Sequence, residues 1–503
     1  MNYTDFVEAT ARAFPDRTAV RAGGDSRTYA DLLDDVRSAA NTLADAGVGP
    51  GDRVLLMLPN TYQFVTAALG VLARQAVLVP VDTRFEQREV TGLLRQVDPA
   101  AAVVSDSTKP VVDASAAAAT NPPTTFVTGD GAGGDSAGGE LHDWEQALAD
   151  AGTAYAIPET LGDRDAVILH TSGSTGAPKA VCHTHANLIA VSDAAAVSYE
   201  MRPGDVFLAV MPLSHCTGLG TVLGPTLKVG GELLLYEGWE PERTLNAIAE
   251  HRVNVFSGVP TMYRDWLGKA GDGIDTSSMH TGVIGGAGVT AALVQESEAL
   301  LGCPVLNGWG MTETFAGGLW EDRRGERRPP SVGRPSGRLF EAKIIDRETG
   351  AECPPGKPGE LLVRGAAMMT GYLDHEAAWS GEWFHTGDYA RRDDGFVTIL
   401  DRADDTIVTG GENVFPQEIE TVIEELPDVQ EAVVIGKPDD RKGEKPVAFV
   451  RTVPESDLTE RAVKERVLAE LAAFKHPREV YFVDSLPRTA GGKTDREALA
   501  ARL

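Results

Sequence analysis

Short apolar runs alternate with Ala- and Leu-rich stretches over the first two thirds of the chain. The runs are RVLLML (53–58), AVLVPV (76–81), AVILH (166–170), VFLAVMPL (206–213) and VNVFSGVP (253–260), and the stretches between them carry apolar residues at helical spacing. Short, continuous apolar runs are typical of strands that are buried on both faces. From about residue 28 to 330 the pattern therefore predicts an α/β core with largely buried strands.

The pattern changes twice toward the C-terminus. From 341 to 365 and beyond, short apolar segments are separated by Gly and Pro turns, which predicts a smaller β-rich subdomain. After Asp401 the order becomes a helix (416–426), two strands (431–436 and 446–453), a helix (459 to about 474) and the apolar segment 480–487. This order predicts an α+β module of roughly 100 residues with its own core. We therefore expect a large domain at 1–400, a boundary at 401–405 and a small domain at 406–503.

The segment between 105 and 140 differs from both patterns. It is rich in Ala, Gly, Ser, Thr and Asp, and it shows little periodicity beyond TTFVTG (124–129). Such composition is typical of surface loops. We expect a surface excursion here that takes no part in catalysis.

The composition is that of an acidic globular protein. Of 503 residues, 42% are hydrophobic, which is enough for real cores and more than one domain. The formal net charge of −28 argues against non-specific binding to nucleic acid or to an anionic membrane, because the long-range field repels both. Twelve of the 46 basic residues are lysines, and this acidic, lysine-poor balance indicates a high-salt cytoplasm. We expect small or locally recognised partners, and a homodimer is compatible with the sequence.

Signals for export or membrane insertion are not evident. The N-terminus lacks an apolar region, and the most hydrophobic stretch, 65–81, is interrupted by Arg74, Gln75 and Pro80. The four cysteines are widely separated, which fits a reducing cytoplasm better than a disulfide-rich secreted protein. The last residues, Ala-Arg-Leu (501–503), loosely resemble a peroxisomal address, but such a tripeptide arises easily at the end of an Ala/Leu/Arg-rich helix. We therefore expect a cytoplasmic protein.

One loop, HTSGSTGAPK (170–179), has the composition of an anion site. Glycines let the backbone come close to a ligand, and hydroxyl and amide groups donate hydrogen bonds to phosphate. A P-loop has its lysine directly after glycine and before Ser or Thr, whereas Pro178 and Ala180 flank Lys179 here. The loop therefore predicts a phosphate site of another kind. The residues predicted to bind phosphate are Thr171, Ser172, Gly173, Ser174, Thr175, Gly176 and Lys179.

Six further stretches follow this loop in a recognisable order. They are MPLSHCTGLG (211–220), IGGAGV (284–289), NGWGMTET (307–314), WFHTGD (383–388), DRADDTIVTGGENVFPQEIE (401–420) and LPRTAGGKTDR (486–496). Together with the loop they resemble the adenylate-forming superfamily, most closely its acyl-CoA synthetases, and the resemblance covers nearly the whole chain. It implies a large AMP-binding α/β domain of several subdomains and a small, mobile α+β C-terminal domain.

The resemblance implies a nucleotide site in the large domain. Asp388 would accept hydrogen bonds from the ribose hydroxyls, and Glu313 would help to coordinate Mg²⁺. Trp309 stands where a Tyr is often found, and an indole offers an equal face to a purine. Read alone, Asp388 can close a turn, Glu313 can cap a helix and Trp309 can be a core residue. The residues assigned to ATP or AMP in this way are Gly286, Ala287, Gly288, Trp309, Gly310, Thr312, Asp388 and Arg402.

The C-terminal stretches imply a mobile catalytic lysine. The GGKT at 491–494 is no Walker motif, because Pro487 occupies the position of its first glycine. Lys493 is either an ordinary solvated lysine or the family's catalytic lysine, whose ammonium neutralises charge on an attacked phosphate. Asp404 corresponds to the hinge about which the small domain rotates. Gly410 and Gly411 would then line the tunnel for the pantetheine arm of CoA.

The stretch 211–220 implies the acid site. His215 is either the group that borders the carboxylate pocket or a core histidine. The residues assigned to the acyl pocket are His215, Cys216, Thr217, Gly218 and Phe315. No aspartate for an α-ammonium and no cation for a second carboxylate stands in these motifs, so fatty or aryl acids are favoured. His183 and His185 lack accompanying metal ligands, and we expect them to be structural or exposed.

The motif set implies an enzyme with two half-reactions, an AMP-forming acid–thiol ligase. A carboxylic acid and ATP, with Mg²⁺, give acyl-AMP and pyrophosphate, and CoA then takes the acyl group. A standalone adenylation enzyme that loads a carrier protein is the alternative. A non-catalytic nucleotide-binding regulator has no support, because Lys493, Glu313, Asp388 and Arg402 are all present.

Overall fold

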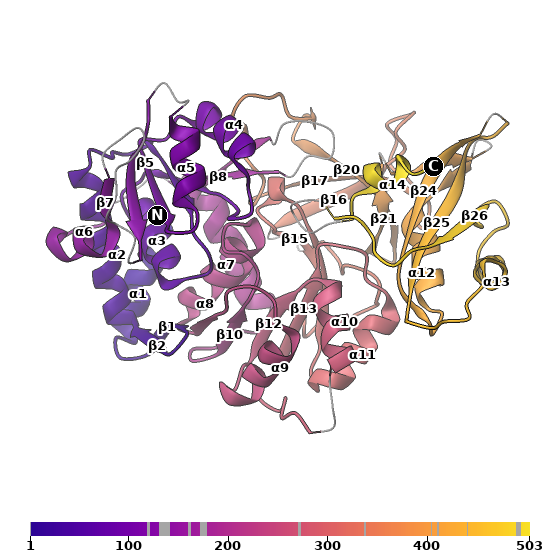
Figure 1. Ribbon diagram of the computed structural model, residues 1–503, viewed down its shortest axis with the longest axis horizontal. Coiled ribbons are helices and arrows are strands. Elements are labelled where there is room, and N and C mark those ends of the chain that lie inside the picture. The colour runs from indigo at the N-terminus through magenta and orange to yellow at the C-terminus, as the bar shows by residue number, and fades with distance from the viewer. Residues whose placement is uncertain are drawn as a thin grey trace.

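Two large sheets with helices on both faces make up most of the chain (Figure 1). The structure is a computed structural model, and it describes residues 2–117, 121–129, 141–158, 162–171, 179–269, 273–335, 339–403, 405–409, 412–439, 441–488 and 494–503. Within these residues the strands form two eight-stranded sheets, both in the large domain, and two five-stranded sheets.

The first large sheet is parallel through its middle. Its strands are, in spatial order, β15 (Gly318–Trp320), β14 (Val305–Gly310), β13 (Thr281–Gly285), β12 (Val255–Gly258), β10 (Val206–Ala209), β11 (Glu232–Leu235), β1 (Thr18–Ala22) and β2 (Asp25–Thr28). From β14 to β1 all neighbours pair in parallel, and the edge strands β15 and β2 are antiparallel. The carboxyl ends of β13 and β14 therefore meet at one edge of this sheet.

The second large sheet carries the phosphate loop. Its strands are, in spatial order, β18 (Gly371–Tyr372), β9 (Ala180–Thr184), β8 (Asp165–His170), β4 (Val77–Pro80), β3 (Arg53–Met57), β5 (Ala101–Ser105), β6 (Thr124–Thr128) and β7 (Leu141–Asp143). The loop joins β8 to its antiparallel neighbour β9. Thr184 ends β9 and caps the next helix, α7 (His185–Ser198), by accepting a hydrogen bond from the backbone N–H of Asn187.

Three hydrophobic clusters bind sheets and helices into alternating layers. One cluster fills the space between the two large sheets, around α1 (Asp5–Ala13), α2 (Tyr29–Asp45), α3 (Tyr62–Ala73), α7 and α8 (Gly224–Val229). A second covers the outer face of the first sheet with α9 (Pro241–Glu250), α10 (Pro260–Lys269) and α11 (Ala291–Leu301). A third covers the outer face of the second sheet with α4 (Gln87–Val97) and α5 (Lys109–Ala116). Helix α6 (Trp144–Ala151) packs on α2.

Two smaller sheets follow in the chain. The β-rich subdomain contains β16 (Phe340–Ile345), β17 (Gly359–Gly365), β19 (Trp379–Ser380), β20 (Trp383–Asp393) and β21 (Phe396–Arg402). The C-terminal domain contains β22 (Ile407–Thr409), β23 (Glu412–Val414), β24 (Val429–Asp439), β25 (Gly443–Thr452) and β26 (Glu479–Phe482), with α12 (Pro416–Glu424), α13 (Glu460–Glu470) and α14 (Arg496–Ala500). Its core is separate, as the sequence predicts. Figure 1 shows it at the end of the molecule opposite the N-terminus.

The predicted α/β class is confirmed, and all five apolar runs contain strands. Three details differ. The segment 105–140 is more than a surface excursion, because it contains α5 and also β6, an inner strand whose Phe126 and Val127 are buried. The last long helix ends at Glu470, before the expected 474. Asp401 and Arg402 belong to β21 of the large domain, so the connection to the small domain begins after them.

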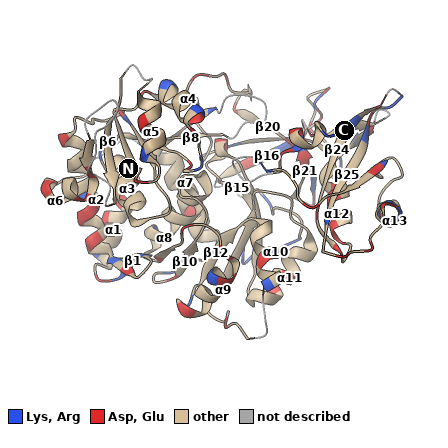
Figure 2. Cartoon of the chain, viewed as in Figure 1, with Lys and Arg blue, Asp and Glu red and all other residues tan. Residues whose placement is uncertain are grey.

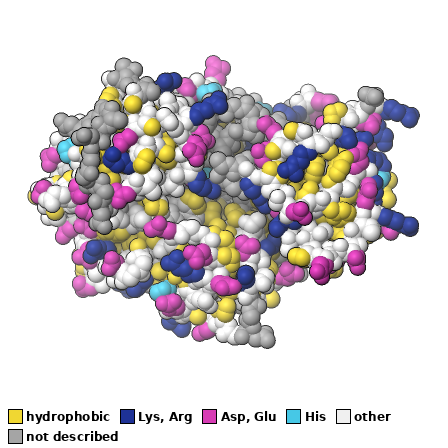
Figure 3. All heavy atoms as spheres, in the orientation of Figure 1, with side chains coloured by type: hydrophobic (Ala, Val, Ile, Leu, Met, Phe, Trp, Pro, Cys, Tyr) yellow, Lys and Arg dark blue, Asp and Glu magenta, His cyan; other side chains and the backbone are white. Residues whose placement is uncertain are grey.

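Charge is unevenly distributed over the surface. Acidic residues occur along the helices of the large domain, and basic residues occur at the tip of the strands β24 and β25 and on α13 (Figure 2). In the face shown in Figure 3 the surface is hollowed between the large domain and the C-terminal domain. No helix among the described residues is both long and apolar enough to cross a membrane.

Candidate active site

Three of the predicted nucleotide residues form a contiguous chain of contacts. The indole N–H of Trp309, on β14, donates a hydrogen bond of 2.7 Å to Oδ2 of Asp388, on β20. The guanidinium of Arg402, on β21, lies 3.1 Å from Oδ1 of the same carboxylate. Asp388 is buried, whereas the Arg402 side chain is exposed. The indole is thus oriented by its N–H, which leaves its ring faces for contact with a planar group.

Glu313 lies in a 3-10 turn, Thr312–Thr314, directly after β14. Its Oε1 accepts a hydrogen bond of 2.8 Å from the hydroxyl of Tyr372, on β18. Burial and the neighbouring Glu313 raise the pKa of Tyr372, so the phenol remains a donor. Glu313 is buried, and among the described residues Oε1 alone of its two carboxylate oxygens has a hydrogen-bond partner.

His183 contacts the same turn through a hydrogen bond to its backbone. Its Nε2 donates a hydrogen bond of 2.7 Å to the carbonyl oxygen of Thr312, and burial lowers its pKa to about 4, so the ring is neutral. His185 accepts a hydrogen bond of 3.1 Å from the backbone N–H of Tyr3 at Nδ1. Both histidines therefore have structural roles, as the sequence predicts.

The phosphate loop is described only at its ends. The backbone N–H of Thr171 donates to the carbonyl of Lys179, and that of Lys179 donates to the Thr171 hydroxyl. Lys179 is exposed, and its Nζ lies 5.1 Å from the centroid of the Tyr372 ring. The remaining predicted phosphate ligands, Ser172, Gly173, Ser174, Thr175 and Gly176, lie outside the described residues, as do Asp404, Gly410, Gly411 and Lys493.

The predicted adenine slot follows β13. Gly286, Ala287 and Gly288 are exposed, and Gly286 has φ +80°, a conformation that favours glycine. A Cβ on Gly288 would lie 2.3 Å from Nε2 of Gln417, in the C-terminal domain. A side chain at position 288 would therefore displace the end of the Gln417 side chain, which is flexible enough to move. Gly310, also assigned to the nucleotide, lies at the end of β14, where a Cβ would meet the carbonyl of Ala316 at 2.5 Å.

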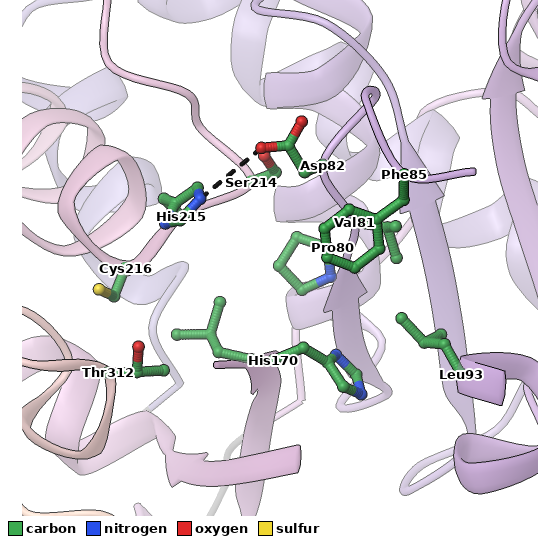
Figure 4. A pocket seen from close by; sticks show the side chains of 11 residues that line it. Pro80, Val81, Asp82, Phe85, Leu93, His170, Ser214, His215, Cys216 and Thr312 are labelled. Carbon is green, nitrogen blue, oxygen red and sulfur yellow. Dashed lines mark ion pairs between the residues drawn. The ribbon is translucent and has the colours of Figure 1, made fainter. Parts of the chain in front are cut away.

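A cavity lies beside this site, between the ends of β4 and β8. His215, Cys216 and Thr312 lie on one side of it and Phe85 and Leu93 on the other (Figure 4). The remaining residues that line it are Pro80, Val81, Asp82, Leu169, His170 and Ser214. Most of the lining is apolar, which is suited to the hydrocarbon part of an acid.

Polar groups stand at one end of the cavity. Nε2 of His215 lies 3.7 Å from Oδ2 of Asp82, as the dashed line in Figure 4 marks. Burial alone would raise the pKa of Asp82, but the hydrogen bonds from Arg84 and the adjacent His215 hold it well below its usual range. Asp82 is therefore ionised, and its carboxylate lies beside the His215 ring.

The predicted acyl-pocket residues are only partly brought together. His215 and Cys216 line the cavity, whereas Phe315 is fully buried, with its ring centroid 5.2 Å from that of His183. Thr217 precedes a π-helical segment, Gly218–Leu223, and a Cβ on Gly218 would lie 2.2 Å from the carbonyl oxygen of Pro212. Phe315 and Gly218 therefore support the pocket from behind in this structure.

Two sets of contacts join the C-terminal domain to the large domain. Arg264, on α10, lies 2.6 Å from Oε2 of Glu424, on α12, and burial raises the pKa of this carboxyl to about 7. At the start of α12 the backbone N–H of Gln417 donates to Oδ2 of Asp401. Burial and then Glu420 raise the pKa of Asp401 to about 7. The two contacts lie near opposite ends of α12.

Three contacts that orient predicted site residues were not foreseen from the sequence. They are made by Tyr372, His183 and Asp82. None of these residues lies in the motifs assigned to the nucleotide or the acid, and each acts on a residue distant in the sequence. No local pattern could have identified them.

Comparison with known proteins identifies the family to which the chain is similar. Residues 7–373 match the family model of the AMP-binding enzyme, and residues 418–493 match that of the AMP-binding enzyme C-terminal domain. The feruloyl-CoA synthase of Amycolatopsis sp is 34% identical over 96% of this chain and 95% of its own. Among solved structures, ATP-bound MatB from Rhodopseudomonas palustris is 30% identical with a TM-score of 0.90, over 100% of this chain and 99% of its own. The anthranilate CoA ligase AuaEII in complex with anthranoyl-AMP is 26% identical with a TM-score of 0.92, over 100% and 97%.

Proposed function

The chain belongs to the AMP-binding enzyme family, and from this premise we propose that it is an AMP-forming acyl-CoA synthetase acting on a fatty or aryl carboxylic acid. One observation carries the proposal. Lys179, Glu313 and Asp388, assigned to phosphate, Mg²⁺ and ribose, come from separate segments. Tyr372 contacts both Lys179 and Glu313, and Trp309, on the strand that precedes Glu313, donates a hydrogen bond to Asp388. The relatives named above include a feruloyl-CoA synthase and an anthranilate CoA ligase bound to anthranoyl-AMP, in agreement with this chemistry.

In the first half-reaction the carboxylate oxygen of the acid attacks the α-phosphorus of ATP. A new P–O bond forms, the bond to the β-phosphate breaks, and pyrophosphate leaves. The phosphate loop with Lys179 would bind the leaving phosphates, and Asp388 and Arg402 would bind the ribose end of the nucleotide. Lys493 would neutralise the charge that develops at the α-phosphate. Catalysis is then a matter of positioning and electrostatics, and it requires no covalent bond to the enzyme.

The residues present fit a magnesium ion. Mg²⁺ takes oxygen ligands, commonly one or two carboxylates together with substrate phosphates. Glu313 offers one carboxylate oxygen held by Tyr372 and a second with no hydrogen-bond partner among the described residues. When bound, Mg²⁺ would lower the charge of the phosphates.

In the second half-reaction the sulfur of CoA attacks the acyl carbonyl of acyl-AMP. A C–S bond forms, the C–O bond to the phosphate breaks, and AMP leaves with the electron pair while the thiol proton is lost. His215, which lies beside Asp82 at the cavity wall, would border the carbonyl that reacts. Rotation about Asp404 would bring Gly410 and Gly411 to the path of the pantetheine arm.

The chemistry around the site supports the substrate class and the compartment. The cavity lining is mainly apolar, and its one acidic residue, Asp82, already pairs with Arg84. A fatty or aryl acid suits such a lining. The four cysteines are free thiols, three of them buried, which supports a reducing cytoplasm as the place of action.

An acid panel tests the function. Purified protein, ATP, Mg²⁺ and CoA should release pyrophosphate and form acyl-CoA with at least one fatty or aryl acid. Replacing CoA by a phosphopantetheinylated carrier protein tests the alternative acceptor. Pyrophosphate release with transfer only to the carrier would favour the standalone adenylation enzyme, and no acid-dependent pyrophosphate with any acid would refute both.

We expect Lys179→Ala to slow the use of ATP while the fold is kept. The side chain is exposed, so its loss removes little packing. A charge-assisted contact to phosphate contributes about 1.5 to 3 kcal/mol, or about 10- to 150-fold in kcat/KM for ATP. Steady-state kinetics and a melting curve check this. Lys269→Ala, which removes an exposed lysine of α10, is the control, and wild-type kinetics in Lys179→Ala would exclude Lys179 from the site.

The arrangement of the two domains supports an adenylate-forming state. TM-scores of 0.90 and 0.92 over the whole chain require both domains to lie as in the ATP-bound and anthranoyl-AMP-bound structures. The ion pair of Arg264 with Glu424 and the contact of Gln417 with Gly288 would then stabilise the orientation used for the first half-reaction.

We therefore expect Arg264→Glu to slow acyl-AMP formation and to spare the second half-reaction. The pair is partly buried, so like charges in its place should cost about 1 to 2 kcal/mol, roughly 5- to 30-fold in rate. Pyrophosphate release measures the first step, and thioester formation from synthetic acyl-AMP measures the second. The double variant Arg264→Glu with Glu424→Arg should recover the first step. Equal loss in both steps, without recovery, would contradict this role.

A further inference from the structure

Tyr372 is fixed beside the phosphate loop although it lies far from it in sequence. It belongs to β18, a short edge strand that pairs with β9, and Tyr372 stands opposite Val181. The backbone N–H groups of Thr370 and Leu373 donate to the carbonyls of Cys182 and Ala180. Because β9 begins directly after the loop, this ladder sets the position of Tyr372 relative to the end of the loop that carries Lys179.

The same segment is also bound to the turn that carries Glu313. The backbone N–H of Met369 donates a hydrogen bond of 2.9 Å to the carbonyl of Glu313. The hydroxyl of Tyr372 donates to Oε1 of the Glu313 carboxylate at 2.8 Å. On the other side, Nζ of Lys179 lies 5.1 Å from the Tyr372 ring centroid, within the range of a cation–π contact.

We propose that Tyr372 is a positioning residue that sets the distance between the Glu313 carboxylate and the Lys179 ammonium, and thereby the site for the metal-bound phosphates. This inference rests on the proposed function. Tyr372 touches neither reacting atom, and it acts through the two residues it contacts.

A tyrosine suits this position better than a charged residue. Its hydroxyl occupies one oxygen of Glu313, so the other oxygen would be left to bind Mg²⁺. Its ring attracts the ammonium of Lys179 through a cation–π contact. A carboxylate in its place would pair with this ammonium and neutralise the positive charge that binds phosphate. One side chain therefore orders an anion and a cation and keeps them from pairing with each other.

Two substitutions separate the two contacts. Tyr372→Phe keeps the ring and loses the hydrogen bond to Glu313. We expect the Mg²⁺ concentration for half-maximal pyrophosphate release to rise about tenfold, in line with the loss of a hydrogen bond to a charged group. Calorimetric titration should show ATP affinity weakened in Mg²⁺ and unchanged in EDTA. Tyr372→Leu should in addition weaken ATP binding in EDTA about two- to fivefold, because the cation–π contact is lost.

Tyr62→Phe is the matched control. Its hydroxyl donates to Oδ2 of Asp35 at 2.6 Å, a pair of the same kind between α3 and α2, away from the site. It should leave Mg²⁺ dependence and ATP affinity unchanged, and melting curves verify that all variants fold. If both Tyr372 variants had the same Mg²⁺ dependence and ATP affinity as the wild-type enzyme, the inference would be overturned. The proposed function would still stand as long as the wild-type enzyme releases acid-dependent pyrophosphate. Absence of acid-dependent pyrophosphate in the wild type would instead refute that function.

Discussion

Lys493→Ala should lose most of acyl-AMP formation and keep thioester formation from acyl-AMP. Only the first step builds charge at the α-phosphate, whereas the second attacks a carbonyl after the small domain has turned. Removing a positioned electrostatic group costs on the order of 10² or more in rate. Pyrophosphate release from acid and ATP measures the first step. Conversion of chemically made acyl-AMP with CoA measures the second.

The control for this variant is Lys442→Ala. Lys442 is an exposed lysine of the same domain, in the turn between β24 and β25. It should leave pyrophosphate release unchanged. Equal loss of both half-reactions in Lys493→Ala would contradict a role restricted to adenylation.

Asp404→Pro should have the opposite effect. Proline fixes φ near −65° and resists the backbone rotation that turns the small domain. A misfitting proline costs about 3 kcal/mol, which corresponds to roughly 10² in the rate of the conformational step. Acyl-AMP should therefore still form, while thioester output falls with either the acid or synthetic acyl-AMP.

Asp404→Ala removes the same side chain without fixing the backbone, so it is the matched control and should retain both steps. Loss in both variants would assign the effect to the carboxylate. Normal thioester formation in Asp404→Pro would exclude rotation at this residue.

Most of the fold follows from local sequence pattern. Runs such as 53–57 and 166–170 form inner strands of a sheet. Both faces of this sheet are covered, so a strand with apolar residues at every position can pack on both sides. The segment 105–140 was wrongly expected to be a surface excursion because its composition lacks such a continuous apolar run. Strand β6 is as long as β3, but three of its five residues are threonine, so only Phe126 and Val127 give an apolar signal. Composition over the whole segment 105–140 does not reveal an apolar signal of two residues.

The candidate site was predictable in its residue types but not in its pairings. Glu313 and Asp388 were identified by motif, and in the structure Glu313 accepts a hydrogen bond from Tyr372 and Asp388 accepts one from Trp309. The partners that orient them, Tyr372 and Trp309, lie on other strands, and their contacts depend on how β18, β14 and β20 are placed. Trp309 was expected to offer only a ring face, yet its N–H also orients Asp388.

Oxygen transfer from the acid tests the central claim most directly. The acid is labelled with ¹⁸O in its carboxylate, incubated with ATP, Mg²⁺, CoA and the enzyme, and the nucleotide product is analysed by mass spectrometry. If the carboxylate attacks the α-phosphorus and CoA later displaces AMP at the carbonyl carbon, AMP must carry one labelled oxygen, and pyrophosphate none. Unlabelled AMP, or ADP with labelled phosphate, would contradict an acyl-adenylate intermediate in this enzyme.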